Sequence, residues 1–191
     1  YLPKGITRKL DLLLKKLEAT QEIELSLAHG DFTPWNCKFK EGNKLYIFDW
    51  EFMNEDYPIL FDAIHYITQN AILVDRKNWK NIKETIYNRF QRFLPHYIKN
   101  LELYIDLYLL VNTLNQLEIF YNQTKWHTQV AWLLNTWNQA LSESLMHHAP
   151  QRETLIGDIY DALHHHDYAT LKKEHGNPIE LDEYSDLDIC I

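Results

Sequence analysis

Three oxygen-bearing side chains, Asp31, Asn36 and Asp49, lie within one short stretch of the chain. Phosphoryl transfer needs a carboxylate that orients and deprotonates the attacking hydroxyl group. It also needs an amide oxygen and a second carboxylate that hold Mg²⁺ against the nucleotide phosphates. The residue types therefore predict a phosphoryl-transfer site, with Asp31 as the catalytic base and with Asn36 and Asp49 as ligands of Mg²⁺.

The motifs around these residues are specific. Residues 29–36 read His-Gly-Asp-Phe-Thr-Pro-Trp-Asn, and residues 47–51 read Ile-Phe-Asp-Trp-Glu. The step of five residues from Asp31 to Asn36 is that of the kinase catalytic loop. Together the two motifs resemble the aminoglycoside phosphotransferase and choline kinase-like family, whose members are small-molecule kinases with a protein-kinase-like fold. The similarity is strongest over residues 25–65 and extends more loosely to about residue 148.

The resemblance implies an enzyme that moves the γ-phosphoryl group of ATP or GTP to a hydroxyl of a sugar, an amino alcohol or an aminoglycoside. It implies that His29 braces the catalytic loop and that Asp62 stabilises the loop by hydrogen bonds. Glu51 either supports the metal site or is an ordinary structural or surface glutamate. In this family the helices after the second motif line the acceptor pocket, which places the pocket within about 55–135. The polar and aromatic candidates there are Tyr66, Gln69, Asn70, Asn112, Asn115, Gln116, Tyr121 and Trp132.

The elements that position the site can also be predicted. Residues 23–28 alternate as a short strand, and residues 37–48 predict a β-hairpin with turn residues at its centre. Such a hairpin would return the chain so that Asp49 lies near Asn36. Apolar residues at helical spacing predict helices over 6–18, from Pro58 to about 71, and over 79–93, 100–122 and 127–146. The expected fold is α+β and mainly α, a kinase-like C-terminal lobe with a catalytic hairpin and a helical bundle.

The nucleotide-clamping half of such a kinase is not visible in this sequence. Only 28 residues precede His29, and they predict a helix and a short strand without a glycine-rich loop. By resemblance, an N-terminal lobe is expected upstream, and the isolated chain is not expected to turn over ATP efficiently. The alternative is a pseudokinase-like binding or scaffold module, against which the intact set of Asp31, Asn36 and Asp49 argues.

The character of the chain changes near residue 150, which predicts a kinase-like lobe over 1–150 and a separate segment over 151–191. Residues 153–166 predict a helix, and the chain ends in an alternating strand that contains Asp186 and Asp188. With the upstream Gly176-Asn177, this strand resembles the start of a polymerase-β-like nucleotidyltransferase domain, in which two such carboxylates share one face and hold a metal ion. The alternative is an ordinary acidic strand or a ragged end. The nucleotidyltransferase reading implies that the chain is a fragment of a kinase–nucleotidyltransferase fusion.

The composition narrows the range of partners. A net charge of −8 argues against a general nucleic-acid binder, which would carry a basic surface. No run approaches the roughly 20 apolar residues of a membrane span, so no membrane partner is expected. Two cysteines far apart in the sequence give no disulfide framework and fit a cytoplasmic location.

Overall fold

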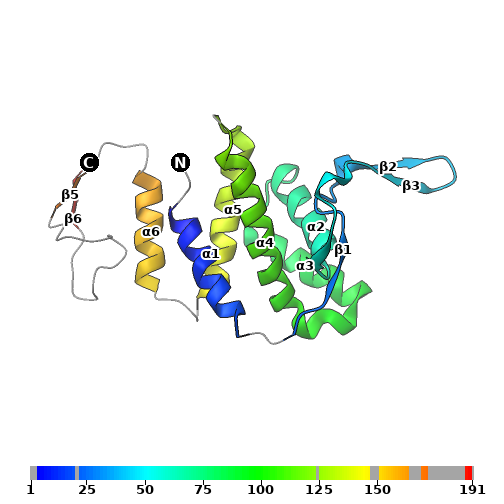
Figure 1. Ribbon diagram of the computed structural model, residues 1–191, viewed down its shortest axis with the longest axis horizontal. Helices are drawn as coiled ribbons and strands as arrows, with labels where there is room; N and C mark the ends of the chain where they lie inside the picture. Colours follow the sequence, from blue (N-terminus) through cyan, green and yellow to red (C-terminus); the bar gives the residue numbers. More distant parts are fainter. Residues whose placement is uncertain are drawn as a thin grey trace.

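The computed structural model describes residues 4–19, 22–123, 125–146, 151–163, 169–171 and 188–190 of the chain. Within these residues helices predominate, and the strands form two-stranded antiparallel sheets, so the fold is α+β and mainly α, as the sequence predicts (Figure 1). The α-helices are α1 (Lys4–Leu17), α2 (Phe61–Leu73), α3 (Trp79–Phe93), α4 (Leu101–Tyr121), α5 (Thr128–Leu145) and α6 (Gln151–Leu163). The strands are β1 (Leu25–Ala28), β2 (Cys37–Lys40), β3 (Lys44–Ile47), β4 (Asn54–Pro58), β5 (Ala169–Leu171) and β6 (Asp188–Cys190). Short 3₁₀ helices are η1 (Pro34–Asn36), η2 (Trp50–Phe52) and η3 (Pro95–Asn100).

The predicted helices are confirmed, with differences of a few residues at their ends. α3 begins where the Asn78 side chain accepts a hydrogen bond from the Asn81 amide, which is the usual way of capping a helix start. Its apolar face, which carries Ile82, Ile86 and Phe90, is buried in the common core. Among the described helices, none is both long and apolar enough to cross a membrane.

Helix α1 lies between α5 and α6 and packs against both (Figure 1). Its residues Leu10 and Leu13 are buried, as the helical spacing predicts. Lys9 is also completely buried. Its ammonium group lies 2.6 and 2.7 Å from the two carboxylate oxygens of Asp158 on α6 and 2.7 Å from the amide oxygen of Asn138 on α5. This ion pair fastens α6 to the bundle.

The β-hairpin is confirmed, and it projects from one end of the molecule (Figure 1). Cys37 pairs with Ile47 at its base and Lys40 pairs with Lys44 next to the turn. A second pair of strands was not predicted. β4 pairs with β1, and Pro58 lies opposite Leu25.

The expectation that a helix starts at Pro58 is wrong. Pro58 is the last residue of β4, and α2 begins at Phe61, after Leu60 adopts a left-handed backbone with φ of 68°. A proline has no N–H group, and it is tolerated in a strand that lacks a neighbour on one side. The sheet of β1 and β4 has only two strands, so it can accept the proline at its end.

The C-terminal predictions are tested only in small part. β6 pairs with β5, with Asp188 opposite Leu171, so a strand is present at residues 188–190. Asp186 lies outside the described residues, as does the side chain of Asp188. The predicted metal role of this pair, the boundary near residue 150 and the second domain therefore stay predictions.

The crossing of α1 and α6 leads to a stability prediction. A Cβ atom added to Gly157 would lie 3.0 Å from the Cα atom of Gly5, a tighter contact than packed backbones normally make. Overpacking of this kind costs about 1–3 kcal/mol, whereas alanine favours a helix over glycine by about 1 kcal/mol. We expect Gly157→Ala to lower the free energy of unfolding by about 1 kcal/mol, measured by urea denaturation. The control is Ala162→Gly, at an exposed position of the same helix, because it exchanges alanine and glycine without changing the contact with α1. If Gly157→Ala were more stable than the unmodified protein, α1 and α6 would be able to move apart at no cost in free energy, and the prediction would be wrong.

Candidate active site

The loop that carries Asp31 starts at a glycine that the structure requires. β1 ends at Ala28, and the chain turns at Gly30 with φ of +84°. The backbone of Phe52 passes so close that a Cβ atom on Gly30 would lie 2.4 Å from the Phe52 carbonyl oxygen. Because glycine has no Cβ atom and adopts positive φ without strain, it allows this close crossing of the two segments.

The loop is fastened to α2 by the carboxylate of Asp62. The backbone N–H of His29 donates to Asp62 Oδ2 at 2.7 Å, and that of Gly30 donates to Asp62 Oδ1 at 3.1 Å. Asp62 lies in the first turn of α2, where the helix dipole also favours a negative charge. One side chain therefore fixes two consecutive backbone groups directly before Asp31.

The buried imidazole of His29 connects the loop to the second motif. Its Nε2 lies 2.7 Å from the carbonyl oxygen of Phe48, which can only accept, so Nε2 carries the hydrogen. Nδ1 then accepts from the backbone N–H of Asp31 at 3.3 Å. The ring also packs against Trp50, with centroids 4.6 Å apart. His29 thus lies beneath the loop and holds it against the residues on either side of Asp49.

Asp31 and Asn36 are brought into direct contact. The amide nitrogen of Asn36 donates to the backbone carbonyl oxygen of Asp31 and to Asp31 Oδ2, both at 2.9 Å. Both partners only accept hydrogen bonds, so the nitrogen of the amide must face them and the amide oxygen must point elsewhere. Asn36 is buried at the end of η1, and the Asp31 side chain is 30% exposed. The pair therefore combines a fixed amide with a carboxylate that a ligand can reach.

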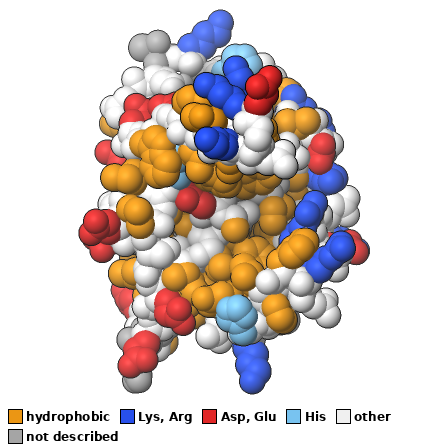
Figure 2. Space-filling model, turned by 90° about the vertical axis from the view of Figure 1, so that its right-hand side faces the viewer, with side chains coloured by type: hydrophobic (Ala, Val, Ile, Leu, Met, Phe, Trp, Pro, Cys, Tyr) orange, Lys and Arg blue, Asp and Glu red, His pale blue; other side chains and the backbone are white. Residues whose placement is uncertain are grey.

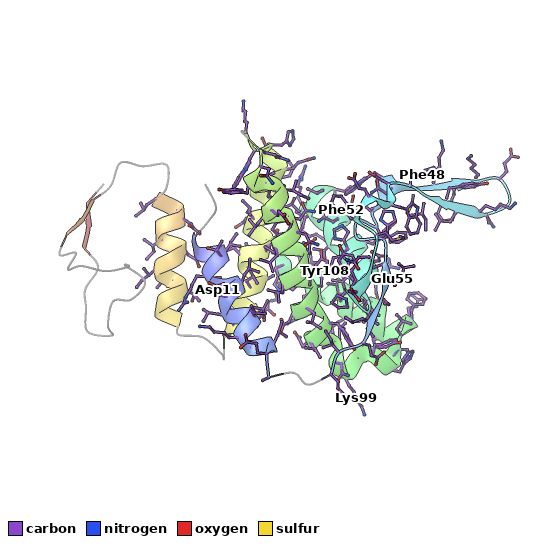
Figure 3. The ribbon with its side chains drawn as sticks, in the orientation of Figure 1. Asp11, Phe48, Phe52, Glu55, Lys99 and Tyr108 are labelled. Carbon is purple, nitrogen blue, oxygen red and sulfur yellow. The ribbon has the colours of Figure 1, made fainter. Side chains whose placement is uncertain are left out.

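The hairpin brings Phe48, the residue before Asp49, into contact with Asn36. The backbone N–H of Phe48 donates to the carbonyl oxygen of Asn36 at 2.9 Å, and the Phe48 carbonyl oxygen accepts from His29, so both backbone polar groups of Phe48 are anchored. Figure 3 labels Phe48 at the base of the hairpin. Asp49 follows with φ of 66° and ψ of 59°, a left-handed backbone that is uncommon for residues other than glycine. Such conformations concentrate at functional sites. The side chains of Asp49 and of Glu51, in η2, are exposed.

A histidine that the sequence analysis missed completes the arrangement. His65, on α2, is fully buried, and its Nε2 lies 3.0 Å from Asp31 Oδ1. The hydroxyl of Tyr108, on α4, lies 3.3 Å from His65 Nδ1. Burial raises the pKa of the Tyr108 phenol, and the nearby charge of Asp31 raises it further, so the hydroxyl keeps its proton.

The sequence did contain a signal for His65. Residues three apart on a helix lie on the same face, and His65 follows Asp62 by three. If Asp62 faces the catalytic loop, His65 must face it as well. The helix predicted from Pro58 to about residue 71 already contains both residues, so the signal was present and was overlooked.

Comparisons with known proteins do not identify the chain. No protein-family model, no curated protein and no solved structure matches it. The likeness to kinases therefore rests on the motifs themselves.

The predicted magnesium site stays a prediction. Among the described residues, no group of three or more His, Cys, Asp or Glu side chains is arranged to hold a metal ion. An asparagine and an aspartate that share a metal ion with nucleotide phosphates form a different kind of site. The amide oxygen of Asn36 and the exposed carboxylate of Asp49 are hard oxygen donors, which Mg²⁺ prefers.

The residues proposed for the acceptor pocket do not line one pocket. Gln69 and Asn112 are buried in the core, with 4% and 2% of their surface exposed. Tyr121 lies thirteen residues after Tyr108 on the same helix, which puts them about 20 Å apart at 1.5 Å per residue. Tyr121 lines a groove between α1 and α4 and cannot share a pocket with Asp31. Tyr66 is better placed, because its ring packs 5.6 Å from that of Phe32, the neighbour of Asp31.

The surface around the candidate site is unusually apolar. Five large side chains of η1, η2 and the segments beside them are 39–51% exposed: Trp35, Phe48, Trp50, Phe52 and Met53. Figure 2 shows this end of the molecule, where apolar side chains surround a hollowed region. Soluble monomers rarely expose so many apolar groups together unless a ligand or another protein segment binds there.

Proposed function

We propose that the chain carries the catalytic part of a small-molecule kinase, which transfers the γ-phosphoryl group of ATP or GTP to a hydroxyl group. The observation that carries the proposal is the pair of 2.9 Å hydrogen bonds from the Asn36 amide nitrogen to Asp31. These bonds join the candidate base and a candidate metal ligand in one rigid unit. Phosphoryl transfer depends mainly on such positioning, because the protein itself contributes little covalent chemistry.

The residues present fit a magnesium ion. Both hydrogen bonds of Asn36 use its nitrogen, so its oxygen is turned away from Asp31 and can ligate a cation. Asp49 offers a second, exposed oxygen donor from a backbone that His29 and Asn36 hold in place. When Mg²⁺ is bound with the nucleotide, it neutralises charge on the phosphates.

Asp31 accepts the proton of the acceptor hydroxyl in this proposal. Its carboxylate is partly exposed, so a substrate can reach it, while Asn36 and His65 each hold one of its oxygens. A carboxylate oxygen has two lone pairs, so each oxygen can still accept a further hydrogen bond. His29 and Asp62 keep the loop in place and do not take part in the chemistry.

The acceptor is a small hydroxyl compound such as a sugar, an amino alcohol or an aminoglycoside. The exposed apolar side chains Trp35, Phe48 and Phe52 suit a nucleotide base. A cytoplasmic location, where nucleoside triphosphates are abundant, is part of the same proposal.

The test is acceptor profiling with the full-length gene product. The purified protein is incubated with Mg²⁺, with ATP or GTP, and with a panel of sugars, amino alcohols and aminoglycosides. The release of nucleoside diphosphate is then measured. We expect acceptor-dependent release, and we expect Asp49→Asn to weaken it strongly and to raise the Mg²⁺ concentration needed for half-maximal rate.

Asp75→Asn is the matched control, because it makes the same chemical change in a surface ion pair with Lys77. Surface pairs of this kind contribute little to stability, so its turnover should equal that of the unmodified protein. Nucleotide binding without turnover of any acceptor would favour the pseudokinase-like alternative. An Asp49→Asn protein with normal magnesium dependence would remove Asp49 from the metal site.

A further inference from the structure

We propose that His65, supported by Tyr108, is a positioning residue that holds the Asp31 carboxylate in the orientation needed to accept the acceptor proton. This inference rests on the proposed function and names a part of the site that the motifs do not contain. His65 lies on α2, and Tyr108 lies on α4.

The direction of the hydrogen bonds follows from the chemistry of the partners. A carboxylate only accepts, so the 3.0 Å contact from His65 Nε2 to Asp31 Oδ1 requires a hydrogen on Nε2. In the neutral imidazole Nδ1 is then an acceptor, and the Tyr108 hydroxyl can donate to it at 3.3 Å. The chain of donors therefore runs from Tyr108 through His65 to Asp31.

Packing fixes the imidazole in one orientation. His65 and Tyr108 are both completely buried. The ring of Phe61 stacks on His65 with an interplanar angle of 9°, and it also packs against Tyr108 with centroids 5.3 Å apart. His65 therefore cannot contact a substrate itself, and it has little freedom to turn away from Asp31.

The consequence for Asp31 is that both carboxylate oxygens are held. Oδ1 accepts from His65, and Oδ2 accepts from Asn36. Either bond alone would let the carboxylate rotate about its last side-chain bond, whereas two bonds from opposite partners fix its plane. A misplacement of about 1 Å at a reacting group can cost about 10²-fold in rate.

An ordinary core histidine would have the same burial, so the test must separate positioning from packing. His65→Gln keeps an N–H donor near the place of Nε2, and His65→Leu keeps bulk without a donor. In the full-length protein, we expect His65→Leu to lower kcat by about 10²-fold with little change in the acceptor KM. We expect His65→Gln to recover most of that loss. Thermal unfolding of each variant measures any structural damage, and Tyr108→Phe, which keeps the ring, should lower kcat by less than His65→Leu.

A second measurement does not depend on turnover. Nitrogen NMR of the imidazole side chains should show a hydrogen on Nε2 of His65, and the chemical shift of the Asp31 carboxyl carbon should change in His65→Leu but hardly in His65→Gln. An Nε2 without a hydrogen, or equal kcat in the two folded His65 variants, would overturn the positioning role. The expected NMR result in a protein that phosphorylates no acceptor would instead overturn the proposed function and leave the hold on Asp31 in place.

Discussion

Replacing Asp31 by asparagine is expected to lower kcat of the full-length protein by about 10²–10⁴-fold, because loss of a general base typically costs that much. An amide of the same shape cannot take up the acceptor proton. In the native protein Asn36 Nδ2 lies 2.9 Å from one carboxylate oxygen of Asp31, and His65 Nε2 lies 3.0 Å from the other. The new NH₂ group would therefore face one of these two hydrogen-bond donors, and that hydrogen bond would be lost. The acceptor KM should change little, since the substitution mainly affects the reacting state.

The measurement is steady-state release of nucleoside diphosphate, with the acceptor and nucleotide varied separately. Asp75→Asn again serves as the control at a surface ion pair. Circular dichroism and thermal unfolding should show that Asp31→Asn is folded. A folded Asp31→Asn protein that turns over at the normal rate would exclude Asp31 from the chemistry.

Replacing Gly30 by alanine is expected to cause a large loss of stability. The new Cβ atom would lie 2.4 Å from the carbonyl oxygen of Phe52 and 2.8 Å from the Phe52 Cβ atom, so the backbone itself must move. The positive φ of +84° adds strain for any residue with a side chain. Together these terms should lower the free energy of unfolding by about 2–4 kcal/mol. Turnover should fall as well, because the next residue is Asp31.

Gly42 provides a matched control for this substitution. It has a similar φ of +79°, in the hairpin turn, but a Cβ atom there would have nothing within 4 Å. Gly42→Ala therefore measures the cost of the backbone conformation alone, about 1–2 kcal/mol. Urea denaturation of the two variants gives the clash at Gly30 by difference. If Gly30→Ala and Gly42→Ala lost the same free energy of unfolding, the backbone at Phe52 would be able to move away from the new Cβ atom at no cost, and the predicted clash would be absent.

Local patterns in the sequence were sufficient for most of the helices and for the hairpin. The spacing of apolar residues predicted 79–93 as a helix, which is the extent of α3, and the turn residues around Gly42 predicted the hairpin. β4 was missed because its first residues, Asn54, Glu55 and Asp56, have low strand propensity. They belong to a strand because β1, about 30 residues earlier in the chain, pairs with β4, with Ala28 opposite Asn54 and Ser26 opposite Tyr57. No short-range pattern carries that information.

In the candidate site too, contacts within one loop follow from the local sequence more directly than contacts between separate elements. The contact between Asp31 and Asn36 could be predicted because the two residues are only five positions apart in one loop. The contact between Asp31 and His65 depends on how α2 packs against the loop, so the sequence indicates it only indirectly, through the predicted contact of Asp62 with that loop. Tyr121 was placed near the site on the strength of its residue type, and the length of α4 puts it too far away. Which oxygen ligands a metal ion would use is still a prediction.

The ion pair of Lys9 with Asp158 has a consequence for how the protein is made. The two residues are 149 positions apart, so Lys9 leaves the ribosome long before its carboxylate partner. At 5–20 residues per second, roughly 7 to 30 s pass before Asp158 is synthesised. During that interval a completely buried ammonium group would lack its counter-charge, which is strongly unfavourable. Helix α1 should therefore dock late in biosynthesis, and it has to stay in water until α6 has been translated.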